Sequence, residues 1–387
     1  MHSMNAMQDI HLDHNATTPV APEVLDAMLP FLGPRFGNPS SEHPKGREAR
    51  AAVEAARAEV AALIGADPEE IVFTGGGTEA SNLAIRGTLP ASRPGIVTSM
   101  IEHPATEACC ALLESRGHPV TRIRPGPEGI VDPAGFAAAI GPQTGLVTLI
   151  HSQNETGALQ PVTEVAAITR AAGALMHADV AQSLGKVPVD VAALGVDLLS
   201  IAGHKLYAPK GIGALYIRRG TALRPVLVGA GQERGQRPGT ENVPYIVALG
   251  AACALARREQ ADFARRAAEL SARLLAQLRE QVPGLILTCH PEQRLPNTLN
   301  LLFPGVSGRA LLARCQRVMA STGSACHAAS EEPSATLTAM GIARGAALGA
   351  VRLSLGRATT QSEIEAASAD LIQAWRALAA TPTGVQP

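Results

Sequence analysis

The sequence predicts an α/β fold in which helices cover both faces of a largely parallel sheet, followed by a smaller α+β domain. Three observations lead to this prediction. The chain has 387 residues, of which 46% are hydrophobic, so two domains with a substantial core are expected. Helical and strand patterns alternate through most of the chain, as they do in open parallel sheets. After about residue 245 this alternation gives way to a long Ala-rich stretch and then to shorter elements.

Local patterns place the elements of the sheet. An amphipathic helix is expected over residues 47–64, because apolar residues recur there at helical spacing and Gly65 follows as a stop signal. The short apolar run Glu70–Thr74 is typical of a buried strand that leads into a glycine-rich turn. Further elements are expected as strands at Ile96–Met100, Gly145–His151, Ala174–Ala178, Asp197–Ile201 and Gly213–Ile217, and as helices at 104–116 and 161–172.

The second part of the chain has a different order and length of expected elements. Leu270, Leu274 and Leu278 recur at helical spacing in the Ala-rich stretch, which ends at about residue 281. Shorter strands and helices follow, and a final helix is expected at about 361–379. We interpret this part as a long helix that leads into the smaller α+β domain.

Composition and charge exclude several classes of protein. The formal net charge is −1, with 33 basic and 34 acidic residues, so a nucleic-acid or anionic-membrane surface is not expected. Aromatic residues make up 3% of the chain, which disfavours base-stacking platforms. The most apolar stretch, Val243–Ala256, is too short to cross a bilayer, and the N-terminus lacks the pattern of a secretory signal. We therefore expect a cytoplasmic protein that binds neither nucleic acid nor membrane.

The six cysteines are at positions 109, 110, 253, 289, 315 and 326. No two of them have CxxC spacing, so neither a disulfide framework nor a metal site is expected. Cys326 differs from the others, because it lies among the small residues of Ser321–Ser330, on a segment that can move and cannot shield a thiol. We interpret Cys109, Cys110, Cys253 and Cys315 as small core residues. The sequence does not assign Cys289 to either kind of cysteine.

Three polar segments follow predicted strands, where open α/β sheets bind ligands. Phe73–Glu79 places glycines before a helix, where backbone N–H groups and the helix dipole attract a phosphate. Asp179 follows a second strand and can pair with a protonated pyridine nitrogen. Lys205 follows a third, where desolvation favours Schiff-base formation with an aldehyde. Taken alone, the first segment is also typical of an ordinary glycine-rich turn, Asp179 of a cap at a strand end, and Lys205 of a lysine without a catalytic role. Together the three predict pyridoxal 5′-phosphate (PLP) as the cofactor.

A series of motifs runs along nearly the whole chain: LDHNATTP from Leu12, FGNPSSEH from Phe36, FTGGGTEASNL from Phe73, EHPA from Glu102, QNETG from Gln153, HADVAQ from His177, GHKLYAPKGIGALYIRR from Gly203, GQERGQRPGTEN from Gly231, STGSACHAASEEPS from Ser321 and VRLSLGR from Val351. In these motifs the sequence resembles the PLP-dependent cysteine desulfurases, to which selenocysteine lyases are close. The resemblance implies PLP fold type I. It implies a large PLP-binding domain of residues 15–260 with a mainly parallel seven-stranded sheet, and a small α+β domain of residues 1–14 and 261–387 that carries the Cys326 loop.

The resemblance also implies roles for individual residues. Lys205 would form the Schiff base with PLP, and His103 would stack on the ring and move protons. Asp179 would bind the pyridine nitrogen and Gln182 the ring hydroxyl. The phosphate would be held by Gly77, Thr78 and His204, and also by Thr240 from a second subunit. The substrate would be bound by Asn154 and Arg352, with the guanidinium of Arg352 holding its carboxylate.

The implied reaction converts L-cysteine into L-alanine and leaves the sulfur as a persulfide on Cys326, from which an acceptor protein takes it. The implied assembly is a homodimer, because Thr240 must reach a partner. The alternative is a selenocysteine lyase acting on L-selenocysteine, since the ACH of Ala325–His327 is similar to that group. A weakly catalytic sulfur-relay protein is a further alternative, which the intact set of Lys205, Asp179, His103 and Cys326 disfavours.

Two departures from the family pattern concern contacts and partners. Ala202 stands where many desulfurases have a phosphate-binding serine, so one phosphate contact is expected to be lost or replaced. The chain also ends soon after its last expected helix, without the longer tail that housekeeping members offer to a cluster-assembly scaffold. Such a scaffold is therefore not an expected partner.

Overall fold

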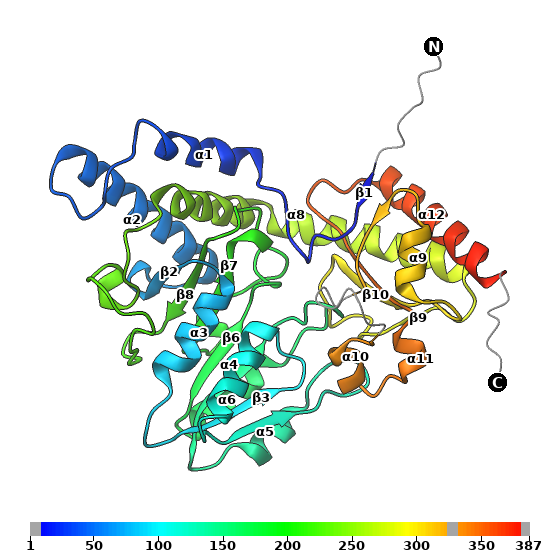
Figure 1. Ribbon diagram of the computed structural model, residues 1–387, viewed down its shortest axis with the longest axis horizontal. Helices are drawn as coiled ribbons and strands as arrows, with labels where there is room; N and C mark the ends of the chain where they lie inside the picture. Colours follow the sequence, from blue (N-terminus) through cyan, green and yellow to red (C-terminus); the bar gives the residue numbers. More distant parts are fainter. Residues whose placement is uncertain (1–8, 323–331, 381–387) are drawn as a thin grey trace.

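The computed structural model describes residues 9–322 and 332–380, and its centre is a seven-stranded sheet (Figure 1). In order across the sheet, the strands are β2 (Ile71–Thr74), β8 (Gly213–Ile217), β7 (Leu198–Ala202), β6 (Leu175–Asp179), β5 (Thr144–Ile150), β3 (Gly95–Ser99) and β4 (Val120–Ile123). Neighbouring strands are parallel except at β8, which is antiparallel to both β2 and β7. The α/β class with a mainly parallel seven-stranded sheet is therefore confirmed.

Helices cover both faces of this sheet. They are α1 (Pro22–Leu32), α2 (Pro44–Ile64), α3 (Gly77–Thr88), α4 (Pro104–Glu114), α5 (Pro133–Ala139), α6 (Val162–Ala171), α7 (Val191–Leu194) and α8 (Val243–Gln281), with 3₁₀ turns at Pro68–Glu70, Gly203–Lys205 and Glu233–Gly235. One face packs against α3 and α4, and the other against a larger cluster that includes α2, α5, α6, α7 and α8. The large part of the molecule is thus a three-layer sandwich of helix, sheet and helix.

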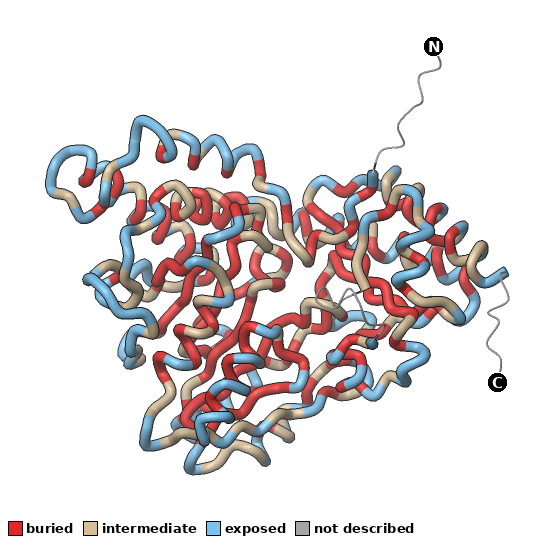
Figure 2. The backbone as a smooth tube through the Cα atoms, viewed as in Figure 1, coloured by how far each residue is buried: buried red, intermediate tan, exposed pale blue. Residues whose placement is uncertain are grey.

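Successive strand residues point to opposite faces, and both faces are apolar. Ile96 and Leu146 pack with α3 and α4, whereas the next residues, Val97 and Val147, pack with the helices of the other face. Figure 2 shows the strands as buried segments inside the molecule. Because both faces are covered, these strands appear in the sequence as short, continuous apolar runs.

The expected elements are found close to their expected bounds. β8 and the last helix, α12 (Gln361–Ala379), have the bounds that the sequence predicts. The helix expected at 47–64 begins earlier, at Pro44, because the His43 side chain caps it and proline suits the first helical position. β4 has no counterpart among the expected strands, since it lies at the sheet edge and its residues are only partly buried.

The C-terminal part of the chain has its own sheet and core. Its elements are the antiparallel strands β9 (Ile286–Leu287), β10 (Thr298–Leu302) and β12 (Ala350–Ser354), the strand β11 (Val318–Met319), and the helices α9 (Gly308–Arg314), α10 (Ala335–Ala339), α11 (Arg344–Ala347) and α12. The N-terminal strand β1 (Ile10–His11) crosses to this part and pairs in parallel with β11, near α12 (Figure 1). Leu12, Leu299 and Leu371 meet in an apolar cluster separate from the large one.

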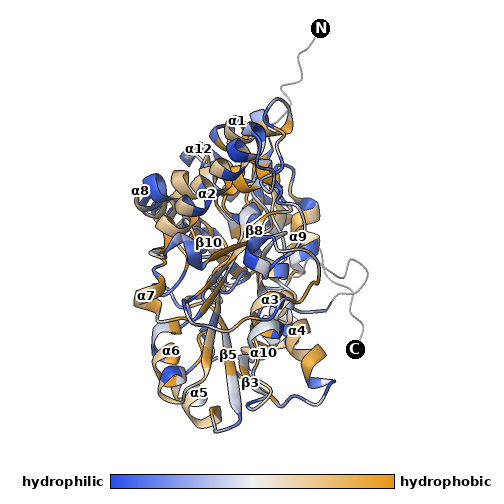
Figure 3. Ribbon diagram, turned by 90° about the vertical axis from the view of Figure 1, so that its left-hand side faces the viewer, coloured by the Kyte–Doolittle hydropathy of each residue, from blue (hydrophilic) through white to orange (hydrophobic). Residues whose placement is uncertain are grey.

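Helix α8 connects the two parts of the molecule. Its first half, with Leu249 and Leu255, packs in the large cluster, and its second half, with Leu274 and Leu278, packs in the C-terminal cluster. Figure 3 shows hydrophilic residues on the outer surface of α8 and apolar strands inside. The expected domain boundary at residue 260 falls inside this helix and stays a prediction. No helix in the described part of the chain is long and apolar enough to cross a membrane.

Candidate active site

The carboxyl ends of several strands meet at one edge of the seven-stranded sheet. β2, β3, β5, β6 and β7 all run in the same direction, because β8 is antiparallel to both of its neighbours. Ligands of open α/β sheets bind at this edge. A cavity of about 140 Å³ lies there, and the residues predicted for the site that line it are Gly77, Thr78, His103, Asn154, Asp179, Gln182, His204 and Lys205.

Lys205 lies in the 3₁₀ turn that directly follows β7, and its side chain reaches the N-terminal segment. Its Nζ donates to the backbone carbonyls of Asn15 and Ala16, at 2.6 and 2.7 Å. Burial lowers the pKa of this amine to about 8, and the positive charge of Arg352 acts in the same direction. Near that pH a large share of the amine is neutral, as a nucleophile toward an aldehyde must be.

Asp179 and His103 supply a carboxylate and an imidazole to the cavity. Asp179 ends β6, and its Oδ1 accepts the N–H of Ala181 at 2.9 Å. Burial raises the pKa of this carboxyl, whereas the charges of His103 and Lys205 oppose that rise. His103 caps α4, since its Nδ1 accepts the N–H of Ala105 at 3.1 Å. Burial lowers the pKa of His103, so the neutral ring prevails and carries its proton on Nε2.

Helix α3 begins at the cavity without a side-chain cap. Its N-cap, Gly76, has a φ of 148°, which glycine adopts far more readily than other residues. A Cβ atom on Gly77 would lie 3.1 Å from the Cβ of Ala202, so the turn is also closely packed. The first turn of α3 therefore presents N–H groups and the positive end of the helix dipole, beside Thr78 and His204. This geometry suits a phosphate group.

The cavity opens at this point into a wider one of about 830 Å³. Gly77, Thr78 and His204 line both cavities, and the wider one adds cationic side chains that include Lys210. Thr240, the residue expected to complete a partner's phosphate site, lines neither cavity and is exposed. Its role toward a second copy of the chain stays a prediction.

Gln182 is held by a buried polar network that sequence reasoning missed. Its Nε2 donates to the backbone carbonyl of Asn15 at 2.8 Å, and its Oε1 accepts from Nζ of Lys186 at 2.7 Å. Lys186 also donates to Oδ1 of Asn15, at 3.0 Å. Asn15 therefore contacts both Lys186 and Lys205. The motif LDHNATTP marked this segment in the sequence, but the motif alone assigned no role to Asn15.

The two predicted substrate residues come from different parts of the chain and are joined directly. Nη1 of Arg352 in β12 donates to the backbone carbonyl of Asn154 at 3.0 Å, and Nη2 pairs with Oδ1 of Asp13 at 2.7 Å. Arg352 is buried, and its Nε has no hydrogen-bond partner among the described residues. Arg352 is not part of the lining of the 140 Å³ cavity. Its predicted contact with a substrate carboxylate would form beside Asn154.

Cys326 lies outside the described residues, and the chain on either side of its segment is attached to the substrate residues. Before it, Ser321 pairs with Arg352 through two backbone hydrogen bonds. After it, the Thr336 hydroxyl donates to Oε1 of Glu155 at 3.2 Å, next to Asn154 in the chain. Among the described residues, Ser321 before this segment therefore contacts Arg352, and Thr336 after it contacts Glu155.

The five described cysteines are not activated thiols. Burial raises the pKa of Cys109 and Cys289 to about 11 and that of Cys315 to about 12, and it raises the pKa of Cys110 and Cys253 as well. Four of them are buried and Cys315 is partly buried, so none resembles a reactive thiolate. Among the described residues, no three His, Cys, Asp or Glu side chains gather as ligands for a metal ion.

Residues 10–367 match the family described as aminotransferase class-V. The chain is 45% identical to "Cysteine desulfurase IscS" of Anaeromyxobacter dehalogenans (strain 2CP-C) over 362 residues, which cover 92% of this chain and 90% of that protein. It is 42% identical to "Cysteine desulfurase" of Rattus norvegicus, over 93% of this chain and 81% of that protein. The chain belongs to the cysteine desulfurases of the class-V aminotransferase family.

Two solved structures have the same fold as this chain. A structure titled "NIFS-LIKE PROTEIN" superposes with a TM-score of 0.89 at 33% identity, and the match covers 97% of this chain and all of that one (100%). A structure titled "SspA in complex with cysteine" superposes with a TM-score of 0.78 at 34% identity, over 89% of this chain and 98% of that one. The second title names cysteine as the molecule bound to that protein.

Cysteine desulfurases of this family are PLP enzymes, and the residues of the cavity fit that cofactor. The uncapped start of α3 suits the phosphate, Asp179 suits the pyridine nitrogen, and Lys205 suits the aldehyde. When bound, PLP supplies an aldehyde that condenses with amines and a ring that accepts electrons from bonds broken at the substrate. The protein supplies the groups that hold this ring and move the protons.

Proposed function

We propose that this desulfurase takes sulfur from L-cysteine, releases L-alanine, and carries the sulfur as a persulfide on Cys326 to an acceptor protein. The observation that supports the proposal most strongly is that Lys205, Asp179 and His103 line one cavity at the carboxyl edge of the sheet. A poised amine, a buried carboxylate and a neutral imidazole are the groups that proton transfer at an amino acid's α-carbon requires.

Each of these residues has a separate task in the proposal. Lys205 would hold the cofactor through Nζ, and its amine, when free, would take the substrate's α-proton. Asp179 stabilises positive charge on the pyridine nitrogen, and His103 holds a proton on Nε2 within the cavity. Arg352 and Asn154 orient the substrate, which is consistent with the hydrogen bond between them.

Cys326 carries out the transfer of sulfur. Its thiolate attacks the sulfur of the substrate, so an S–S bond forms as the substrate's Cβ–S bond breaks. The electron pair of the broken bond stays on the substrate, and a proton added at Cβ completes the methyl group of alanine. No external oxidant is needed, since the enzyme thiol and cysteine together have the same atoms as the persulfide and alanine. Because the carrier must be a free thiol, we place the reaction in the reducing cytoplasm.

The experiment that tests this proposal follows alanine release and the position of the bound sulfur. Cys326→Ala is expected to keep the visible absorbance of bound PLP and to release almost no alanine from cysteine, since no other described thiol is activated. Cys289→Ala is the matched control and is expected to keep wild-type turnover. Mass spectrometry that locates the persulfide on Cys289, or undiminished turnover in Cys326→Ala, contradicts the proposal.

The role of Lys205 is tested by borohydride reduction followed by peptide mapping. Lys205→Ala is expected to lose covalently bound PLP and nearly all turnover. The reduced adduct in the wild type is expected on Lys205, because this lysine lines the candidate cavity. An adduct on Lys186 or Lys210 contradicts the assignment.

Selenocysteine lysis is the second candidate, favoured by the ACH sequence of Ala325–His327. Wild-type alanine release from L-cysteine and L-selenocysteine, measured side by side, decides between sulfur and selenium. The weaker carbon–selenium bond can break without a protein nucleophile, so Cys326→Ala is expected to retain part of its activity on selenocysteine alone. Turnover on neither substrate would favour the sulfur-relay alternative.

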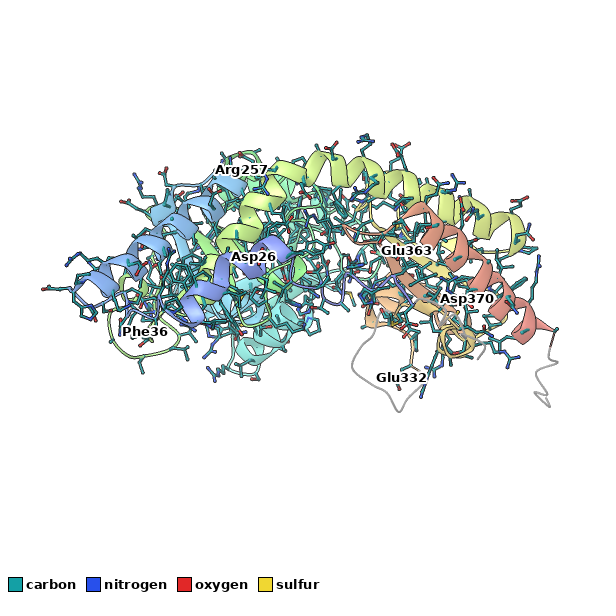
Figure 4. All side chains as sticks on the ribbon, turned by 90° about the horizontal axis from the view of Figure 1, so that it is seen from above. Asp26, Phe36, Arg257, Glu332, Glu363 and Asp370 are labelled. Atoms are coloured by element: carbon teal, nitrogen blue, oxygen red, sulfur yellow. The ribbon has the colours of Figure 1, made fainter. Side chains whose placement is uncertain are left out.

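We further propose a homodimer in which Thr240 completes the phosphate site of the partner. Several observations support this assembly. Thr240 is exposed, and in the segment before it Val228 is 92% exposed. Phe36 is 70% exposed at the end of the molecule remote from α12 (Figure 4). A contact with a second copy of the chain would remove these apolar side chains from water. Sedimentation that finds a PLP-loaded, fully active monomer would rule the dimer out.

A further inference from the structure

Lys186 is a buried lysine to which the proposed reaction gives no task. The residue is 5% exposed, and its Nζ donates to two amide oxygens, Oε1 of Gln182 and Oδ1 of Asn15. No carboxylate of the described residues lies within ion-pair distance of it. A buried ammonium without an anionic partner is costly, so a position of this kind calls for an explanation beyond stability.

The charged groups around Lys186 are cations. Burial lowers its pKa well below the usual value for lysine, and the positive charges of Lys205 and Arg352 lower it further. Burial is also the main cause that lowers the pKa of His14 to about 4, with His11 and Lys186 acting in the same direction. Arg352 pairs with Asp13, and the charges of Asp13 and Asp179 act on Lys205, but among the described residues no carboxylate acts on Lys186. An anion that arrives with a ligand would supply that negative charge.

The hydrogen bond between Lys186 and Gln182 fixes which side of the Gln182 amide faces the site. Nζ of Lys186 donates to the amide oxygen and the carbonyl of Asn15 can only accept, so the oxygen of the amide faces Lys186 and the NH₂ group faces away from it. One N–H of that group goes to the carbonyl of Asn15. The other has no partner among the described residues, and Gln182 lines the candidate cavity. An acceptor in the cavity would complete the amide's hydrogen bonds.

We propose that Lys186 is a positioning residue: it orients the Gln182 amide to donate to the ring oxygen of PLP, and the negative charge on this oxygen favours the ammonium form of Lys186, which stabilises that charge through the amide. The inference rests on the proposed function, in which Gln182 contacts the ring hydroxyl. A donor that is itself polarised by a cation makes a stronger hydrogen bond to an anionic oxygen. The ring oxygen would then be the anion that the buried ammonium lacks.

The test is a double-mutant cycle on the PLP-loaded enzyme, read by the visible absorbance of the cofactor as a function of pH. Lys186→Met keeps most of the side-chain volume and removes the charge, and Gln182→Met removes the amide. Loss of a nearby cation favours the protonated form of the cofactor at Lys205, so the midpoint of the absorbance change is expected to rise by about one pH unit in Lys186→Met. Adding Lys186→Met to Gln182→Met is expected to raise the midpoint by clearly less than Lys186→Met does in the wild type, because only the direct charge effect of Lys186 remains once the amide is absent.

The control is Arg257→Met, which removes a surface cation of α8 that pairs with Glu59. Arg257 does not line the candidate cavity. Its midpoint is expected to equal that of the wild type. If Lys186→Met does not fold, Lys186→Gln takes its place, since it keeps a donor and loses the charge. An unchanged midpoint, or shifts that add in the double variant, overturns the inference. A wild-type enzyme whose PLP is not bound at Lys205 contradicts the proposed function instead.

Discussion

The two ends of the candidate cavity differ in how much of the site one chain supplies. At the ring end, defined by Asp179 and His103, the polar groups are buried and hydrogen-bonded within the same chain. At the phosphate end, defined by Gly77 and Thr78, the cavity opens into a space of about 830 Å³. One chain thus supplies the groups proposed for proton transfer, and in the proposed dimer a second copy would add to the phosphate end alone.

The largest expected effect belongs to the ring end. Asp179→Asn removes the charge that stabilises the protonated pyridine nitrogen, so turnover should fall on the order of 100- to 1000-fold while PLP remains bound. Steady-state alanine release and the absorbance of the purified variant measure the two quantities. Asp132→Asn, at the exposed cap of α5, is the matched control and should keep wild-type turnover. Similar turnover in both variants would show that the ring end does not depend on this carboxylate.

A pH effect on stability should also arise at the ring end, from Glu102. Burial raises the pKa of this carboxyl to about 8; its Oε1 accepts from the Ser99 hydroxyl and the Ile150 N–H, and its Oε2 has no partner among the described residues. The folded protein therefore keeps a proton that the unfolded chain loses above its ordinary pKa. Stability is present at low pH and falls as pH rises toward 8.

Glu102→Gln keeps the Oε1 acceptor and has no proton to lose, so it removes this pH dependence. Relative to the variant, the unfolding free energy of the wild-type apoprotein should decline by up to about 1.4 kcal/mol per pH unit between about pH 5 and pH 8. Urea denaturation at several pH values measures the slope. Parallel curves for the two proteins would mean that Glu102 is already ionised in the folded state.

At the phosphate end the expected effects are smaller. In the proposed dimer, Thr240→Ala would remove one hydrogen bond to the partner's phosphate, so PLP affinity should fall by about tenfold, with turnover at saturating PLP nearly unchanged. Equilibrium dialysis of the apoprotein measures the affinity. Thr240→Ser keeps the hydroxyl and should restore wild-type binding. A loss of turnover at saturating PLP would place Thr240 in the chemistry rather than in phosphate binding.

The smallest expected effect is a gain. Ala202 lines the cavity close to Gly77, so Ala202→Ser brings a hydroxyl to the start of α3, where a phosphate would accept from it. PLP affinity should rise by about two- to fivefold, as expected for the modest net gain from one added hydrogen bond. The same dialysis experiment detects it. Weaker binding in the variant would indicate that the close packing against Gly77 leaves no room for the hydroxyl.

How much of this site could be predicted from sequence depends on the kind of contact. Strands buried on both faces appear as short apolar runs, so the positions of Asp179 and Lys205 at strand ends followed from local patterns. The network around Gln182 did not, because Lys186 and Asn15 are 171 residues apart in the chain and meet only through tertiary packing. An AQSLGK segment with a terminal lysine is typical of an exposed turn, and no local pattern reveals that this lysine is buried.

The pairing of the N-terminal strand with the C-terminal part has a consequence for biosynthesis. Leu12 accepts a hydrogen bond from Ser354, 342 residues later, and the neighbouring Asp13 pairs with Arg352. The ribosome must therefore release nearly the whole chain before Arg352 can take its place beside Asn154. Contacts of such long range form slowly. Completion of the proposed substrate site is thus a late event in folding, and a chain truncated before β12 would contain Lys205 and Asp179 but not Arg352, the residue proposed to hold the substrate carboxylate.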